Sequence, residues 1–190
     1  MKDKNDKNLN KSVIIVMVLV VIASFMTLSY AFFSTVITNG TIYTTSGTGK
    51  DNSPNIELIE SNSGLSLTNA FPMSDQQGRA TTPYTFTVKN NGTVSAKYNL
   101  YIETKSNNTL PDSLVRYDLN GTATNLTSKV SSTATTSGYT TRYIIVSAAS
   151  LAGGASTAYN LRTYIMESAT TANAANKTWV GKVTMEATVA

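Results

Sequence analysis

The side chains that carry out most enzyme chemistry are absent from this sequence, which contains neither histidine nor cysteine. Without histidine there is no Ser-His-Asp triad and no unperturbed general base that titrates near neutral pH. Without either residue, the usual ligands of structural and catalytic zinc are also missing. The residue inventory therefore predicts no catalytic residues, no metal ligands and no cofactor, and we predict that the protein is not an enzyme.

Carboxylates are the remaining groups that could do chemistry. Glu57 lies near Glu60 in the sequence, and Asp112 lies near Asp118. A glycosidase needs two carboxylates that face each other across a cleft, whereas these pairs fall on predicted strand edges and loops. We interpret all four as solvated positions.

Two further aspartates stand in oxygen-rich loops of the kind that suits a calcium ion. Asp51 lies in KDNSPN and Asp75 in PMSDQQG, and neither has the acidic spacing of an EF-hand loop. We interpret both as exposed turns. Gly153-Gly154 leads into another predicted strand and not into a helix, so it is a turn and not a phosphate-binding loop.

Aromatic side chains could instead form a face on which a ligand stacks. Tyrosine also suits half-buried strand positions, so we predict that most of these residues take part in core or cross-strand packing. We predict that Trp179 is a core anchor. The residues concerned are Tyr84, Tyr98, Tyr101, Tyr117, Tyr143, Tyr159 and Tyr164.

The elements that position these residues follow a basic tail and an apolar segment. Residues 1–11 carry four lysines and two aspartates, and residues 12–33 contain no charge, proline or glycine. About 20 apolar residues span the hydrocarbon core of a bilayer, and lysines in front of such a segment keep that end in the cytoplasm. The pattern predicts an exported protein, either extracellular or at the cell surface, with a cytoplasmic N-terminus before processing.

The apolar segment 12–33 is either a retained membrane anchor or a cleaved signal peptide. It is longer than the usual signal core of about 7–15 residues, which favours an anchor. Ser29 and Ala31, however, match the small-x-small rule for cleavage after Ala31 by a signal peptidase. We predict cleavage there. If the segment stays uncleaved, it holds the protein in the membrane.

The charge distribution argues against a nucleic-acid partner. The net charge is +4, but residues 32–190 carry eleven Lys or Arg and nine Asp or Glu, with both signs interspersed. A nucleic-acid surface needs clustered basic residues. We therefore expect no binding to nucleic acid.

From Ile56 onward the sequence alternates apolar and polar residues. Thr82–Lys89 and Ala96–Glu103 show this pattern on either side of an Asn-Gly turn, and Trp179–Val189 shows it most clearly. Strands with one polar face are typical of antiparallel sheets. We predict that residues 56–190 form an all-β, antiparallel β-sandwich of the jelly-roll or immunoglobulin-like kind.

Three stretches lack a strong alternating pattern. We predict weak strands and loops for Thr122–Tyr139, and a loop or a single helical turn for Ser168–Asn176.

The third stretch, residues 34–55, is rich in Thr, Ser and Gly, and we interpret it as a linker. Its first half also contains β-formers, which make a strand upstream of the domain a candidate for donation to another subunit. The donor-strand residues are Val36, Ile37, Ile42 and Tyr43.

Several motifs in this order resemble the TasA/camelysin family of bacterial exported proteins, which a SipW-type signal peptidase processes. They are the lysine-rich start with an apolar segment ending in YAFF (30–33), LSLTNAFPMSD (65–75), YTFTVKNNGTVSAKYNLYIE (84–103) and LAGGASTAYNLRTYI (151–165). The chain departs from the family in having Ser34 and Thr35, not an acidic residue, after the aromatic pair.

The resemblance implies a jelly-roll-like sandwich exported from a Gram-positive-type cell and assembled into matrix or surface fibres. In such fibres the N-terminal arm of one subunit completes the sheet of the next. Camelysin-type members carry a metalloprotease label, but without His or Cys no residue here matches metal ligands. We therefore predict a structural subunit of a fibre, biofilm matrix or cell-surface layer that self-associates. The alternatives are a membrane-anchored, adhesin-like binding module, with residues 34–55 as a flexible stalk, and, less favoured by the inventory, a secreted hydrolase.

Overall fold

The computed structural model describes residues 17, 35–38, 55–61 and 64–189 of the chain. From Thr35 onward these residues form one compact unit. The predicted tail 1–11, apolar segment 12–33 and most of the linker 34–55 lie outside the described residues. The same holds for the predicted cleavage and donor-strand residues Ser29, Ala31, Ile42 and Tyr43. Among the described residues, no helix is both long enough and apolar enough to cross a bilayer.

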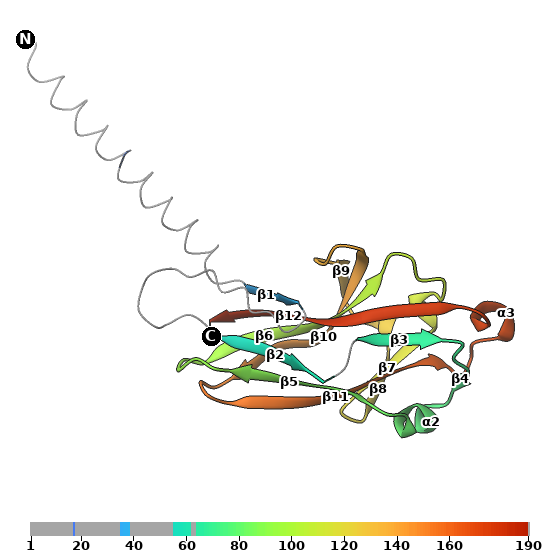
Figure 1. Ribbon diagram of the computed structural model, residues 1–190, viewed down its shortest axis with the longest axis horizontal. Coiled ribbons are helices and arrows are strands. Elements are labelled where there is room, and N and C mark those ends of the chain that lie inside the picture. The colour runs from blue at the N-terminus through green and yellow to red at the C-terminus, as the bar shows by residue number, and fades with distance from the viewer. Residues whose placement is uncertain (1–16, 18–34, 39–54, 62–63, 190) are drawn as a thin grey trace, which may run out of the picture. The chain divides into compact units, whose positions relative to one another are not determined.

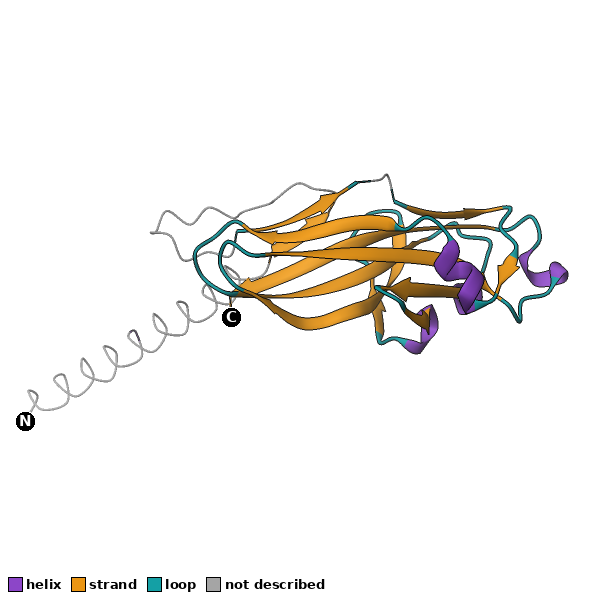
Figure 2. Ribbon diagram, turned by 90° about the horizontal axis from the view of Figure 1, so that it is seen from below, coloured by secondary structure: helices purple, strands orange, loops and turns teal. Residues whose placement is uncertain are grey.

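Two sheets packed face to face make up the domain, which confirms the predicted all-β sandwich (Figures 1 and 2). The first, sheet A, has the order β1-β12-β6-β10-β9, and β3 pairs with β12 beside β1. All its strand pairs are antiparallel. Its strands are β1 (Thr35–Thr38), β3 (Leu65–Thr68), β6 (Ala96–Lys105), β9 (Ser131–Thr133), β10 (Tyr139–Leu151) and β12 (Thr178–Val189).

The second sheet, sheet B, has the order β2-β5-β11-β7-β8, and β4 pairs with the end of β11. The β4–β11 pair is parallel, whereas the other pairs in this sheet are antiparallel. Its strands are β2 (Ile56–Glu60), β4 (Pro72–Met73), β5 (Tyr84–Asn90), β7 (Val115–Leu119), β8 (Thr122–Asn125) and β11 (Ser156–Met166).

The core lies between the sheets and follows the period-2 pattern of the sequence. In β5, Tyr84, Phe86 and Val88 are buried, and the residues between them are less so. Trp179 is fully buried, as predicted for a core anchor. The region Thr122–Tyr139 contains β8, the 3-10 turn η2 (Leu126–Ser128) and β9, which agrees with weak strands and loops. The predicted single turn in 168–176 is α3 (Thr171–Ala174).

The helix α2 (Asp75–Ala80) replaces the exposed turn that we predicted around Asp75. Ser74 caps it: the Ser74 hydroxyl accepts from the Gln77 N–H, and the Gln77 side chain accepts from the Ser74 N–H. Sequence analysis missed this capping box, although Ser-x-x-Gln is its signature. Gly78 lies against the ring of Tyr164, where a Cβ atom would come within 2.6 Å of the ring. The helix therefore rests on sheet B.

The strands run lengthwise between two ends, which Figures 1 and 2 show at opposite sides of the domain. We call one end the base; it consists of the loops 91–95 and 152–155, next to the start of β1 and the end of β12. We call the other end the tip; it consists of residues 69–72 and 168–176, next to the start of β12.

Candidate functional site

The edge of β12 that faces away from β6 is shared by two strands. The register pairs Thr35–Thr38 of β1 with Ala187–Thr184, and Leu65–Thr68 of β3 with Gly181–Thr178. Neither strand pairs with Lys182 or Val183 of β12. We call the part of this edge that follows Gly181 in the sequence the acceptor edge. The strand β1 pairs with it in antiparallel fashion, and β3 occupies the rest of the edge, from Gly181 back to Thr178.

Of the predicted donor-strand residues, Val36 and Ile37 lie on β1, where they pair with Glu186 and Met185 of the same chain. These two residues therefore lie on a strand, but it belongs to the compact unit and completes the edge of sheet A in its own chain. Its donation to another subunit stays a prediction. Backbone pairing at such an edge satisfies N–H and C=O groups that would otherwise face solvent.

A polar layer covers the outer face of sheet A beside this edge. Glu103 on β6 is fully buried and pairs in register with Lys182, which is 5% exposed. The loop before β10 covers Glu103. The Thr135 N–H and hydroxyl donate to its Oε1 at 2.9 and 2.8 Å, and the Thr136 N–H donates to Oε2 at 3.3 Å. The Tyr139 ring centroid lies 5.3 Å from Lys182 Nζ.

The two charges in this layer have shifted pKa values. Burial raises the pKa of Glu103, but the hydrogen bonds from Thr136 and Thr135 and the charge of Lys182 outweigh it, so the pKa lies below its ordinary value. Burial lowers the pKa of Lys182 despite the charges of Glu103 and Glu60. The alternating pattern predicted Glu103 on a polar face, but it gave no sign of the loop that buries the carboxylate.

We expect Glu103→Gln to lower the free energy of unfolding by about 1–3 kcal/mol at pH 7, because its amide group cannot accept from all three donors. The carboxylate contributes stability above its unfolded pKa, and this contribution is lost as pH falls through the lower folded pKa. Urea unfolding at pH 7 and pH 3 should therefore show a difference from wild type that shrinks at pH 3. Exposed Glu167→Gln is the matched control, and an equal loss in both variants would contradict the prediction.

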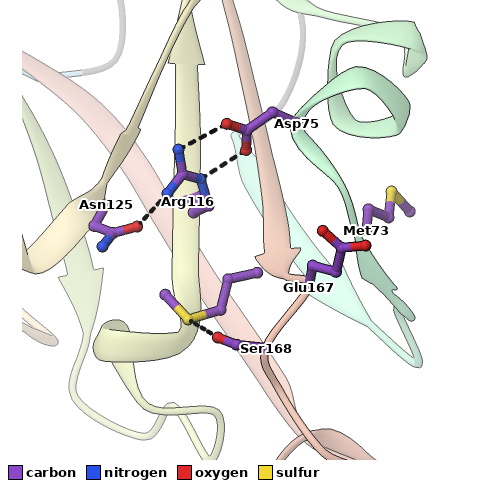
Figure 3. A pocket seen from close by; sticks show the side chains of 7 residues that line it. Met73, Asp75, Arg116, Asn125, Glu167 and Ser168 are labelled. Atoms are coloured by element: carbon purple, nitrogen blue, oxygen red, sulfur yellow. Dashed lines mark hydrogen bonds and ion pairs between the residues drawn. The ribbon is translucent and has the colours of Figure 1, made fainter.

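A second polar cluster lies on sheet B, in a hollow of about 630 Å³. Figure 3 shows Arg116 of β7 at its centre, between Asp75 and Asn125. Arg116 Nη2 donates to Asp75 Oδ2 at 2.9 Å, and Nη1 donates to Asn125 Oδ1 at 2.6 Å. The Tyr164 hydroxyl donates to Asp75 Oδ1 at 2.8 Å. Because the Arg116 guanidinium already donates hydrogen bonds to Asp75 and Asn125, we interpret this cluster as the attachment of α2 to the sheet.

The prediction that Asp112 and Asp118 are solvated is wrong. Asp118 is fully buried and lies 3.7 Å from Arg162 Nη1 and 3.8 Å from Arg79 Nε. Asp112, on the 3-10 turn η1 (Asp112–Leu114), accepts hydrogen bonds from three side chains. Both carboxylates therefore anchor structure. Sequence spacing did not reveal this, because most of the partner side chains are distant in the sequence.

The glutamate pair also departs from the prediction of solvated positions. Glu60 accepts a hydrogen bond from the Tyr84 hydroxyl, and its burial raises its pKa. Glu57 accepts from Asn91 Nδ2 at 3.0 Å. The two residues are three positions apart on β2, so they lie on opposite faces of the strand. They also bind different partners, and they do not face each other across a cleft.

All seven tyrosines considered as a stacking face are buried, each at most 8% exposed, which confirms their predicted place in the packing. Among the described residues, no group of three or more Asp or Glu side chains is placed to hold a metal ion. No protein-family model, curated protein or solved structure matches this chain. The acceptor edge is therefore the feature from which we argue function.

Proposed function

We propose that this protein is an exported structural subunit of an extracellular fibre or cell-surface layer, of the kind that its resemblance to the TasA/camelysin family implies. The observation that carries the proposal is the pairing of β1 with β12. A short N-terminal strand completes the sheet edge of a sandwich, and a second copy of the chain offers the same edge. Exchange of β1 between copies would link subunits without any new type of contact.

The opposite edge of sheet A, on β10, is a poor acceptor of a further strand. On its side away from β6, β10 pairs with β9 only over Tyr143–Thr141. The β10–β6 register shifts between Ile144 and Val146 and again between Val146 and Ala149. Ala148 has a φ of 50°, and its N–H already donates to Asn99 Oδ1 at 2.7 Å. Bulges protect sheet edges from pairing, whereas the four β1–β12 pairs form without a shift.

The burial of the tyrosines supports this proposal over the adhesin-like alternative. A glycan-binding module commonly stacks sugars on exposed aromatic rings, yet the only exposed large aromatic residue among those described is Phe71. The acceptor edge, in contrast, is suited to an extended strand.

The test uses the chain as exported. Its N-terminus is determined by mass spectrometry, and negative-stain microscopy detects filaments. Replacing Val36 and Ile37 by proline removes backbone donors from β1, and we expect loss of filaments because proline cannot continue the β ladder. The matched control places two prolines at Ser46 and Gly47, outside β1. Filaments that form equally in both double variants, or a monomeric wild type, would refute the proposal.

Because the chain has no cysteine, a disulfide can report exchange directly. Chains carrying only Val36→Cys are mixed with chains carrying only Glu186→Cys, the register partner of that residue. A disulfide between the two variants requires β1 of one chain on β12 of another. We expect cross-linked dimers from the filaments and none when Lys105→Cys, far from the acceptor edge, replaces Glu186→Cys.

A further inference from the structure

We infer that the tip of the domain is a docking site for the base of a second copy of this chain. The inference rests on the proposed strand exchange and adds a second, apolar contact between the same two subunits. Three observations lead to it: the direction of β1, the length of the segment that follows it, and the composition of the two ends.

The direction of β1 points the following chain toward the tip. Thr35 pairs with Ala187, near the base, and Thr38 pairs with Thr184, farther along β12 toward its start. A β1 strand donated in this register therefore leaves the acceptor subunit in the direction of its tip. About 20 Å of strand separates Thr184 from Thr178, where β12 begins.

The segment between β1 and the donor's own domain is long enough to continue beyond that tip. Residues 39–54 span at most about 55 Å when extended. The donor's domain resumes at its base, where the Asn55 carbonyl accepts from the Asn91 N–H at 2.7 Å. At most about 35 Å of chain thus remains after the acceptor's tip is reached, and the donor's base is the part of the donor tethered closest to it.

The tip exposes one large aromatic ring on an uncharged surface. Phe71 is 79% exposed, although large apolar side chains are elsewhere mostly buried. It lines a hollow of about 270 Å³ between the segment before β4 and α3, together with Pro72, Ala169 and Ala174. Neither tip segment, 69–72 or 168–176, contains a charged residue. Interface cores are depleted of charge and enriched in aromatic residues.

The base offers a matching surface. Its loops 91–95 and 152–155 also contain no charge, and Ala152, Gly153 and Gly154 are exposed small residues. Gly153 lies so close to the Thr93 backbone that a Cβ atom would come within 2.4 Å of it, so the two loops pack as one surface. A surface of small residues leaves room for a protruding ring such as Phe71. The partner that fits the tip is therefore the uncharged base of another subunit.

The experiment compares filament assembly of Phe71→Asp with that of Val130→Asp. Val130 is 78% exposed and lies beside β9, outside the tip, so both variants place a charge on an equally exposed apolar position. We expect Phe71→Asp to raise the concentration needed for filaments about ten-fold or more, because a contact that buries Phe71 is lost. Val130→Asp should assemble like wild type. Circular dichroism should show equal thermal midpoints for both monomers.

A disulfide test locates the contact. In filaments that mix Phe71→Cys chains with Ala152→Cys chains, we expect interchain disulfides, and none when Val130→Cys replaces Phe71→Cys. If Phe71→Asp assembles like wild type and the tip–base disulfide does not form, the docking inference is overturned while strand exchange stands. If wild-type chains form no filaments, the proposed function fails and the docking inference falls with it.

Discussion

Replacing Asp112 by alanine is expected to lower the free energy of unfolding by about 3–5 kcal/mol, a large part of the ~5–15 kcal/mol that stabilises a typical domain. Asp112 Oδ1 accepts from Trp179 Nε1 at 2.8 Å. Its Oδ2 accepts from the Tyr143 and Thr104 hydroxyls, each at 3.0 Å. The three donors are at most 7% exposed. Alanine would leave them without this acceptor, and each buried unsatisfied donor costs about 1–3 kcal/mol.

The isosteric variant Asp112→Asn separates hydrogen bonding from the loss of the side chain. Its amide oxygen can still accept from Trp179, which has only a donor, while the amide nitrogen can donate to the Tyr143 or Thr104 hydroxyl oxygen. We expect it to cost clearly less than alanine, about 1–2 kcal/mol. Urea unfolding followed by fluorescence of Trp179, the single tryptophan, measures both. A loss of only about 1–2 kcal/mol for Asp112→Ala as well would show that the donors find other partners.

The Tyr143 hydroxyl gives an independent check on this cluster. Burial, followed by the charge of Asp112 and the hydrogen bond to it, raises the pKa of Tyr143 to about 12. In Asp112→Ala the two contributions from the carboxylate disappear. The titration of this tyrosine, followed by NMR of its ring because the chain has ten tyrosines, should therefore move to lower pH, and an unchanged titration would show that Asp112 does not contact it in solution.

The fold was predictable because it depends on short-range periodicity. A sandwich buries one face of each strand, so the pattern of β5 around Phe86, and that of β12 from Trp179 to Ala187, is visible in the sequence. Pairing across the sheets is not visible in this way. Nothing in the spacing of β1 and β3 indicates that both strands share one edge of β12.

The polar side chains were harder to predict, because their state depends on partners that are distant in the sequence. Glu103 is buried by Thr135 and Thr136, 32 and 33 residues away, and Asp112 meets Trp179 67 residues away. Alternation places a side chain on a face but does not say whether a loop covers that face. The helix α2 differs, since its capping box at Ser74 and Gln77 is local and its Ser-x-x-Gln signature is visible in the sequence.

Gly181→Ala is expected to cost about 2–3 kcal/mol, although it adds a single methyl group. Trp179 and Gly181 lie two residues apart on the core face of β12. A Cβ atom on Gly181 would come within 2.6 Å of Trp179 Cη2 and 3.2 Å of the Glu103 carbonyl oxygen. The indole has no room to retreat, because it is fully buried and its Nε1 is bound by Asp112. Urea unfolding of the variant measures the loss.

A double-mutant cycle with Trp179→Phe shows whether the clash with the indole is the cause. The smaller phenylalanine ring relieves the contact at Cη2, so we expect Gly181→Ala to cost less in the Trp179→Phe background by about 1–2 kcal/mol. Circular dichroism follows unfolding, since this background lacks tryptophan. Additive losses would place the cost in the β12 backbone next to Glu103 instead. A favourable coupling would mean that the single tryptophan and the glycine form one packing unit at the point where β3 begins, next to the acceptor edge.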